Sequence, residues 1–154
     1  MHISARGDCA VRALTELAGT PDQPMKAEVL ATAQHLSPKL LEAVLTDLRN
    51  GGLVCSRRGP DGGYWLARPA AEISIADVIR IVEGPLASVR GERPEDVTYD
   101  GSAAPLQRVW IAVRVSMRSV LEQVSIADVA TDRLPEFVGE MTADPQAWRR
   151  RETP

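Results

Sequence analysis

The chain has 154 residues, of which 44% are apolar and 4% aromatic, and its formal net charge is −3. This length suits one modest domain with an appended element, and the aliphatic composition predicts a mostly helical core. The slightly acidic balance argues against an indiscriminate binder of polyanions. The chain shows no apolar run long enough to span a membrane and no signal peptide, so we expect a cytoplasmic protein with no membrane partner.

The first 35 residues predict two helices joined by a turn. The first helix covers residues 4–18 and is ended by the Gly-Thr-Pro run at 19–21. The second covers residues 26–34, and His35-Leu36 forms a tight turn into a third helix, which is the spacing of a helix-turn-helix. Three apolar residues of the second helix are expected to face inward: Val29, Leu30 and Ala33.

The third predicted helix has clear start and stop signals. Ser37 suits the N-cap, and Pro38 suits the first helical position because its missing N–H would lack an intrahelical partner there anyway. The glycine pair at 51–52 ends the helix. Apolar residues recur between these signals at three- and four-residue steps and form one stripe: Leu40, Leu41, Val44, Leu45 and Leu48.

A β-hairpin is predicted directly after this helix. Residues 53–56 and 64–67 have the composition of strands, and the loop between them is rich in glycine and carries Arg57 and Arg58. A capped helix followed by a hairpin with basic residues at its tip indicates a winged helix-turn-helix. Such a helix fits the DNA major groove, which is about 12 Å wide.

The predicted DNA-binding residues come from the first turn of the third helix and from the wing. Glycines let the wing tip approach phosphates or the minor groove closely. Arg6 and Arg12 of the first helix are further candidates for backbone contact, although Arg12 fits a solvated face equally well. The wing arginines also have a plainer interpretation, as solvated charges on an ordinary hairpin. The expected DNA-binding set is Ser37, Pro38, Lys39, Glu42, Arg57, Arg58, Gly59, Gly62, Gly63 and Tyr64.

A fourth helix and an irregular connection follow the wing. Ser74 caps the helix, and Gly84-Pro85 ends it. Residues 87–102 then show no periodicity, and a connection of that length is usually functional or disordered. Tyr99 from this connection and Trp110 beyond it are candidates to wall a small-molecule pocket, with core packing as the alternative for Trp110.

A long helix is predicted from Ala103 to Val124, within a segment that we place at 103–130. Its apolar residues advance by alternating steps of four and three, the pattern of a helix that pairs with another helix. Because a complete winged-helix unit precedes it, we expect this helix to form a dimer interface; an internal helix of one domain is the alternative. The expected interface residues are Leu106, Trp110, Val113, Met117, Val120 and Val124.

The last part of the chain gives weaker signals. Residues 125–130 predict a short helix and repeat the Ser-Ile-Ala-Asp-Val letters found at 74–78, which are too few to establish a repeat. Periodicity fades after Thr131, so we expect 131–154 to be a flexible tail. The basic run at 149–151 is expected to be solvated, and DNA contact by it is the less favoured reading.

Two segments carry a family resemblance: RGPDGGYWLARP from Arg58 and ADVIRIVEGP from Ala76. The chain resembles the winged-helix transcription regulators typified by IscR, NsrR and CymR (the Rrf-two type), most closely over 1–86. The resemblance implies a homodimeric bacterial regulator of partly palindromic operators. It also implies that DNA is read by the positions matching Ser37, Pro38, Lys39, Glu42 and Arg58.

The chain departs from the resembled family in its connection. There three cysteines commonly hold an iron–sulfur cluster, whereas residues 87–102 contain no cysteine. Cys9 and Cys55 lie elsewhere, and Asp8 matches a carboxylate that some relatives supply but cannot hold a cluster alone. We therefore predict no cluster and no other cofactor. A buried, inert thiol is the favoured reading for each cysteine over a redox role.

These patterns predict a mainly α fold with a small β-hairpin wing and a long C-terminal dimerisation helix. The predicted function is sequence-specific transcriptional regulation as a homodimer on double-stranded DNA, most simply repression, with an unknown small-molecule effector as a possible partner. The alternative is a winged-helix protein-interaction module, or a ligand-responsive regulator with weak intrinsic DNA binding. No nucleophile–base constellation points to an enzyme, and GPDGGY sits between strands rather than before a helix, so it is no phosphate-cradling loop.

Overall fold

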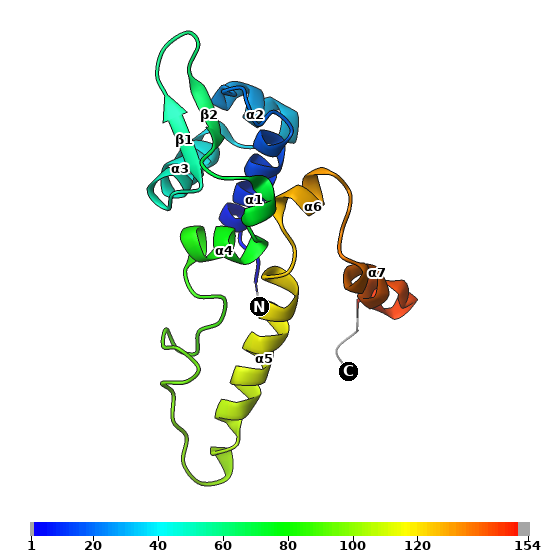
Figure 1. Cartoon of the computed structure of the whole chain (residues 1–154). Helices are drawn as coiled ribbons and strands as arrows, with labels where there is room; N and C mark the ends of the chain where they lie inside the picture. The colour runs from blue at the N-terminus through cyan, green and yellow to red at the C-terminus, as the bar shows by residue number, and fades with distance from the viewer. Residues whose placement is uncertain (1, 151–154) are drawn as a thin grey trace.

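The computed structural model describes residues 2–150, which form a mainly helical molecule with one β-hairpin (Figure 1). The helices are α1 (Ala5–Ala18), α2 (Ala27–Gln34), α3 (Pro38–Asn50), α4 (Ile75–Glu83), α5 (Leu106–Leu121), α6 (Ile126–Ala130) and α7 (Glu136–Ala143). Short 3-10 turns lie at η1 (Ala70–Glu72), η2 (Gly101–Ala103) and η3 (Pro145–Trp148). Strands β1 (Val54–Arg57) and β2 (Gly63–Leu66) pair antiparallel. The predicted winged helix followed by a long helix is confirmed.

The molecule has two differently built parts, which we call the N-terminal unit (α1–α4, the hairpin and α6) and the stalk (residues 84–121). In Figure 1 the chain leaves α4, runs down as an irregular loop and returns upward as α5. Helix α7 stands to one side of α5 and packs on η3. No helix in the described part of the chain combines the length and apolar character needed to cross a bilayer.

Helix α1 is the centre of the N-terminal unit and contacts α2, α3, α4, α6 and β2. One fully buried cluster joins these elements, because the apolar residues of α1, α3 and α4 all face the same interior. Each fully buried leucine contributes about 1.5–3 kcal/mol of hydrophobic free energy. The largest buried side chains of the cluster are Leu14, Leu17, Leu30, Leu41, Leu45, Leu48 and Leu53.

Two segments with the same five-residue sequence, Ser-Ile-Ala-Asp-Val at 74–78 and 125–129, pair with each other in the N-terminal unit. Ser74 and Ser125 face each other as an antiparallel bridge. The Ile75 N–H donates to the Val124 carbonyl, and the Ile126 N–H donates to the Ile73 carbonyl, each at 2.9 Å. Both segments form a capping box with the aspartate three residues on, so each starts a helix. This pairing anchors α6, and with it the end of α5, to the core.

Several predicted details are wrong. Val29 is 53% exposed and Ala33 is also exposed, so only Leu30 of the expected trio on α2 reaches the core. Helix α5 ends at Leu121, three residues earlier than expected. The segment 131–154 is expected to be a flexible tail; α7 and η3 give its described part regular structure, and its flexibility stays a prediction. Arg149 and Arg150 are exposed, as expected, and Arg151 lies outside the described residues.

Candidate nucleic-acid interface and apolar helix face

The first turn of α3 lies at the surface while the rest of the helix holds it in the core. Pro38 occupies the first helical position, and Ser37 stands at the N-cap, although its side chain makes no capping hydrogen bond. Four α3 side chains are buried: Leu41, Val44, Leu45 and Leu48. Because these residues fix one face against the unit, Lys39 and Glu42 are left exposed on the opposite face. The predicted groove-facing residues therefore share one accessible surface.

Two arginines of α1 fix the helix-turn-helix in place. Arg6 forms an ion pair with Asp47 of α3. Arg12 donates to the carbonyl oxygen of Gln34 at the end of α2, and its Nε donates to the Gln34 side chain at 3.1 Å. Of the two readings left open for Arg12, a solvated face does not describe these contacts. In this structure both side chains position α2 and α3.

The turn between α2 and α3 depends on His35. Its backbone has φ 51°, in the left-handed region, and it forms the C-cap of α2. The Leu36 N–H then donates to the Ala31 carbonyl at 2.8 Å, which completes the reversal of the chain. His35 therefore acts as the turn residue that sets the spacing of the two helices.

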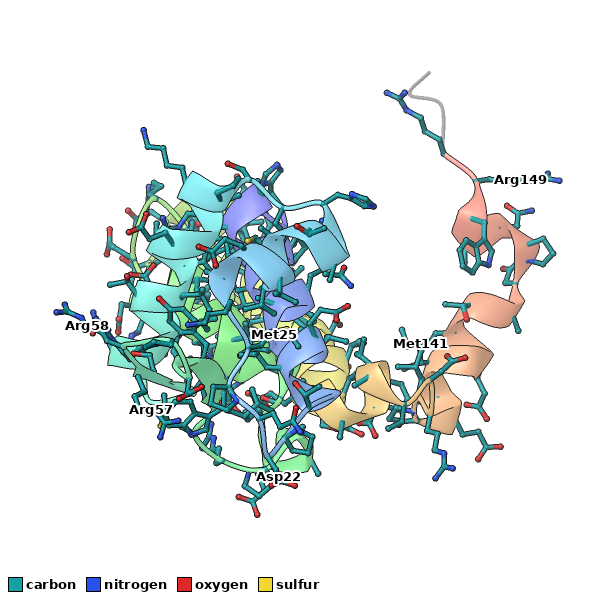
Figure 2. All side chains as sticks on the ribbon, turned by 90° about the horizontal axis from the view of Figure 1, so that it is seen from above. Asp22, Met25, Arg57, Arg58, Met141 and Arg149 are labelled. Atoms are coloured by element: carbon teal, nitrogen blue, oxygen red, sulfur yellow. The ribbon has the colours of Figure 1, made fainter. Side chains whose placement is uncertain are left out.

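The tip of the wing is built by backbone contacts to basic side chains. Arg57 Nη2 donates to the Asp61 carbonyl at 3.0 Å, across the loop. Lys26 Nζ donates to the Gly59 carbonyl at 2.6 Å and ties the tip to the start of α2. Arg58 is exposed and lies at the outer edge of the molecule with Arg57, on the opposite side from Met141 and Arg149 (Figure 2). Arg58 is thus the better placed of the two arginines to meet a ligand.

Three residues of the predicted DNA-binding set, Gly62, Gly63 and Tyr64, also have a structural role in the wing, and their contact with DNA stays a prediction. A Cβ at Gly62 would collide with the Arg57 carbonyl, and a Cβ at Gly63 would lie 2.6 Å from the Met25 carbonyl. Tyr64 is half-buried and exchanges two backbone hydrogen bonds of 2.9 Å with Met25. These contacts brace the wing against the segment before α2. These contacts by themselves explain the residue types at positions 62–64. Gly59, with φ 105° and open space around it, has no such neighbour at the tip.

The stalk carries an apolar face that no other part of residues 2–150 covers. None of the α5 residues is buried, and Val109 and Val113 are 49% and 43% exposed. A shallow apolar depression of about 530 Å³ runs along this face. Its lining is Val109, Ala112, Val113, Ser116, Met117, Val120 and Leu121. A contiguous exposed apolar surface of this kind is typical of a site that another protein surface covers.

This open face overlaps the predicted interface but is rotated around the helix. Val113, Met117 and Val120 belong to both sets. Val124 lies beyond the helix end and is 7% exposed, so it packs within its own chain and leaves the interface set. Leu106 and Trp110 are half-buried. Four residues of this face are outside the predicted interface set: Val109, Ala112, Ser116 and Leu121.

The irregular part of the stalk is held along α5 by specific contacts. Trp110 Nε1 donates to the Tyr99 hydroxyl at 2.9 Å, and Arg114 pairs with Glu95. Val97 of this loop is 1% exposed, so its side chain is buried. Glu95 accepts a hydrogen bond from its own backbone and another from Arg114, and these lower the pKa of its carboxyl. The Trp110–Tyr99 contact joins the helix to the loop, so the two side chains form a strut.

The residues present do not fit an iron–sulfur cluster. Cys9 is buried in α1, and burial raises the pKa of its thiol although Arg12 opposes the shift. Cys55 lies on β1, far from the loop in the stalk. Within residues 2–150, no three His, Cys, Asp or Glu side chains gather into a metal-binding group. A cluster needs about four such ligands, mostly thiolates. We therefore derive no step through a cluster, and its absence stays a prediction.

The fold and the exposed helix define a winged helix-turn-helix protein of the transcription-regulator class. The sequence model of the Rrf2 family, described as an iron-dependent transcriptional regulator, matches residues 3–132. The chain belongs to this family of helix-turn-helix transcriptional regulators.

Relatives and solved structures agree with this assignment. A Mycobacterium tuberculosis (strain H37Rv) protein, provisionally named an HTH-type transcriptional regulator, is 49% identical over 148 residues, which cover 96% of this chain and 92% of the relative. The HTH-type regulator CymR of Bacillus subtilis is 33% identical over 85% of this chain and 91% of its own. The B. subtilis CymR structure superposes with a TM-score of 0.72 at 32% identity, covering 85% of this chain and 97% of that one. The T. potens IscR structure does so at 0.70 and 30%, covering 97% of each.

Proposed function

We propose that the protein is a homodimeric, sequence-specific DNA-binding regulator that recognises a partly palindromic operator. The observation that carries this is the exposure of Lys39 and Glu42 in the first turn of α3 and of Arg58 at the wing tip, all on the N-terminal unit. A recognition helix enters the major groove by its N-terminal residues, and a wing arginine suits the minor groove or a phosphate. Arg57 and Gly59 shape the tip that carries Arg58.

The dimer part of the proposal rests on the uncovered face of α5. Two copies of this face, related by a two-fold axis, would bury the same valines from each chain and remove the exposed apolar surface. A two-fold dimer sets its recognition helices about one DNA turn apart, or a multiple of it, and so requires two related half-sites. Such a regulator acts in the cytoplasm, and repression follows if the operator overlaps a promoter.

Selection from random DNA duplexes tests this function directly. The full-length protein is incubated with the pool, and bound duplexes are recovered and sequenced over several rounds. We expect one enriched motif with two inverted halves, and sedimentation of the purified complex at two chains per duplex. Absence of enrichment would reject DNA recognition and favour a protein-interaction module. Enrichment of a single half-site at one chain per duplex would reject the dimer while leaving the DNA surface in place.

A further inference from the structure

A cavity of about 430 Å³ lies where the end of α4, the loop after it and α5 meet. Four arginines line it: Arg80 from α4, Arg93 from the loop, and Arg114 and Arg118 from α5. Glu95 is the carboxylate in the same lining. Three separate elements therefore bring guanidinium groups to one concave site in a chain whose overall charge is −3.

Neighbouring carboxylates neutralise only part of this charge. Arg80 and Arg118 share Glu122, with 3.1 Å from Arg118 Nε to the carboxylate, and Arg80 also lies 4.0 Å from Asp77. Arg114 pairs with Glu95. In the part of the chain that the structure describes, no ion pair joins Arg93 to a carboxylate. Counting Glu95, Glu122 and Asp77 against the four arginines leaves an excess of positive charge at the cavity.

Arg114 keeps donors that its ion pair does not use. A guanidinium carries five N–H donors in a planar fork, and Glu95 engages one side of it. Such a fork is well suited to carboxylate and phosphate oxygens. The Nε–H has no hydrogen-bond partner among the described residues, but this atom is buried and lies away from the open cavity.

The rest of the wall is apolar. Residues 85–87 (Pro-Leu-Ala) contribute aliphatic surface to the lining. None of the four arginines lines the apolar depression of α5, so the charged side of the cavity lies outside the proposed dimer face. Residues 85–87 also line a neighbouring hollow with Val113, Met117 and Leu121, so the apolar wall lies next to that face.

We propose that this cavity binds a small organic anion, whose carboxylate or phosphate is held by the four arginines and whose short apolar part lies on residues 85–87. The cavity size falls in the range of small-molecule sites, about 300–1,000 Å³. Because its walls come from both the N-terminal unit and the stalk, the bound anion fixes α4 relative to α5. On the proposed function, that relation sets the spacing of the two recognition helices, and the anion is then an effector of DNA binding.

Titration of the ¹⁵N-labelled full-length protein with defined probes tests the site without DNA. The probes are phenyl phosphate and benzoate, which share an apolar ring and differ in head group, with benzyl alcohol as the neutral counterpart. We expect saturable shifts of the Arg114 Nε–H signal and of amides around 84–95 with at least one anion, and none with benzyl alcohol. The tighter of the two anions identifies the head group. Failure of both anions to give saturable shifts there would overturn the site.

Matched variants locate the binding. Arg93→Ala, which breaks no ion pair described above, and Arg118→Ala should each weaken anion affinity about tenfold, the size expected for loss of a charge-assisted hydrogen bond. Arg108→Ala removes an exposed arginine of the same helix outside the lining and should leave the affinity unchanged. Equal affinity of Arg93→Ala and the unaltered protein would overturn the proposal, as would an equal loss in Arg108→Ala. If Arg118→Ala loses its dispersed spectrum, Arg93→Ala alone decides.

The effector role has its own readout. Affinity for the selected duplex is measured by fluorescence anisotropy with and without a saturating concentration of the anion at constant ionic strength. A change of at least about threefold, absent in Arg93→Ala, is expected for coupling. Anion binding with unaltered DNA affinity would overturn the effector role and leave the site. Absence of DNA binding altogether would reject the proposed function, while the spectroscopic result would stand by itself.

Discussion

The N-terminal unit and the stalk differ in how far each buries its amphipathic helix. Helix α3 has 13 residues and buries four of them, whereas α5 has 16 residues and buries none. Both are amphipathic, but α3 lies among α1, α4 and β1, while α5 meets its own chain mainly along the side that faces the loop. The unit completes its core within one chain. The stalk leaves apolar surface exposed on α5. The proposed DNA contacts therefore lie in the part with a complete core, and the proposed dimer contacts lie in the part without one.

Truncation of a core leucine should show the difference most strongly. Leu14 is fully buried in α1, so Leu14→Ala should lower the free energy of unfolding by about 2–5 kcal/mol. Val115 of α5 is 56% exposed, so Val115→Ala should change it by less than about 0.5 kcal/mol. Urea unfolding followed by circular dichroism measures both. Similar losses in the two variants would show that the stalk belongs to the same core.

Charges placed on the open face of α5 should separate the protomers. The double variant Val113→Glu with Met117→Glu would bury two carboxylates from each chain in the interface, and the dimer should weaken by at least about 100-fold. Val115→Glu is the matched control, because position 115 lies about 200° around the helix from 113. Sedimentation velocity should give monomers for the double variant and dimers for the control. A dimeric double variant would remove this face from the assembly.

Loss of the exposed basic residues of the unit should weaken DNA binding without changing the oligomeric state. Arg58→Ala should cost about 1–3 kcal/mol of operator affinity if the side chain reads a base edge or narrow groove. Lys39→Ala should instead reduce the slope of log affinity against log salt by about one if it meets a phosphate. Fluorescence anisotropy at several salt concentrations distinguishes these outcomes, with Arg108→Ala on the stalk as the control. Unaltered binding in both variants would contradict the docking surface.

The smallest effect is expected at the junction of the two parts. The Arg80 hydrogen bond, and then Arg118, lower the pKa of Glu122 below its ordinary value of 4.5. The ionised carboxylate therefore adds stability that is fully present above pH 4.5 and is lost as the pH falls through the lowered pKa. Glu122→Gln should have a slightly lower Tm than the unaltered protein at pH 7, and the two should converge in acid. A constant Tm difference at all pH values would contradict this.

The sequence allowed most of the N-terminal unit to be predicted because its signals are local. The Ser37-Pro38 start and the glycine pair at 51–52 set the ends of α3 to within a residue, and strand-like composition on both sides of the glycine-rich loop predicted the hairpin. Family resemblance rests on those same segments and is confirmed by the family model over residues 3–132. The predicted DNA contacts and the predicted dimer interface stay predictions. Exposure favours Lys39, Glu42 and Arg58 for DNA, and Val113, Met117 and Val120 for the interface.

The errors arose where a residue's neighbours come from far along the chain. Val29 has the spacing of a core residue but is 53% exposed, because α2 turns Leu30 and Ala31, with Ala27, toward the core. No local signal indicates that the Arg57 and Met25 carbonyls leave room only for glycine at positions 62 and 63; DNA contact by these glycines stays a prediction. The pairing of Ser74 with Ser125 could not be read from five repeated letters.

By itself the sequence determined the helices from α1 to α6, but not α7, as well as where the hairpin turns and that the loop after α4 lacks the thiolates of a cluster site. These properties depend on caps, periodicity and composition, which act over a few residues. Only the tertiary structure decided which side of α5 stays open, that Val124 packs inside, and that Arg80, Arg93, Arg114 and Arg118 line one cavity. The path of the loop along α5 decides the open side of the helix and brings Arg93 to the cavity, whereas the pairing of the Ser74 and Ser125 segments holds Val124 inside. No local pattern encodes these long-range contacts.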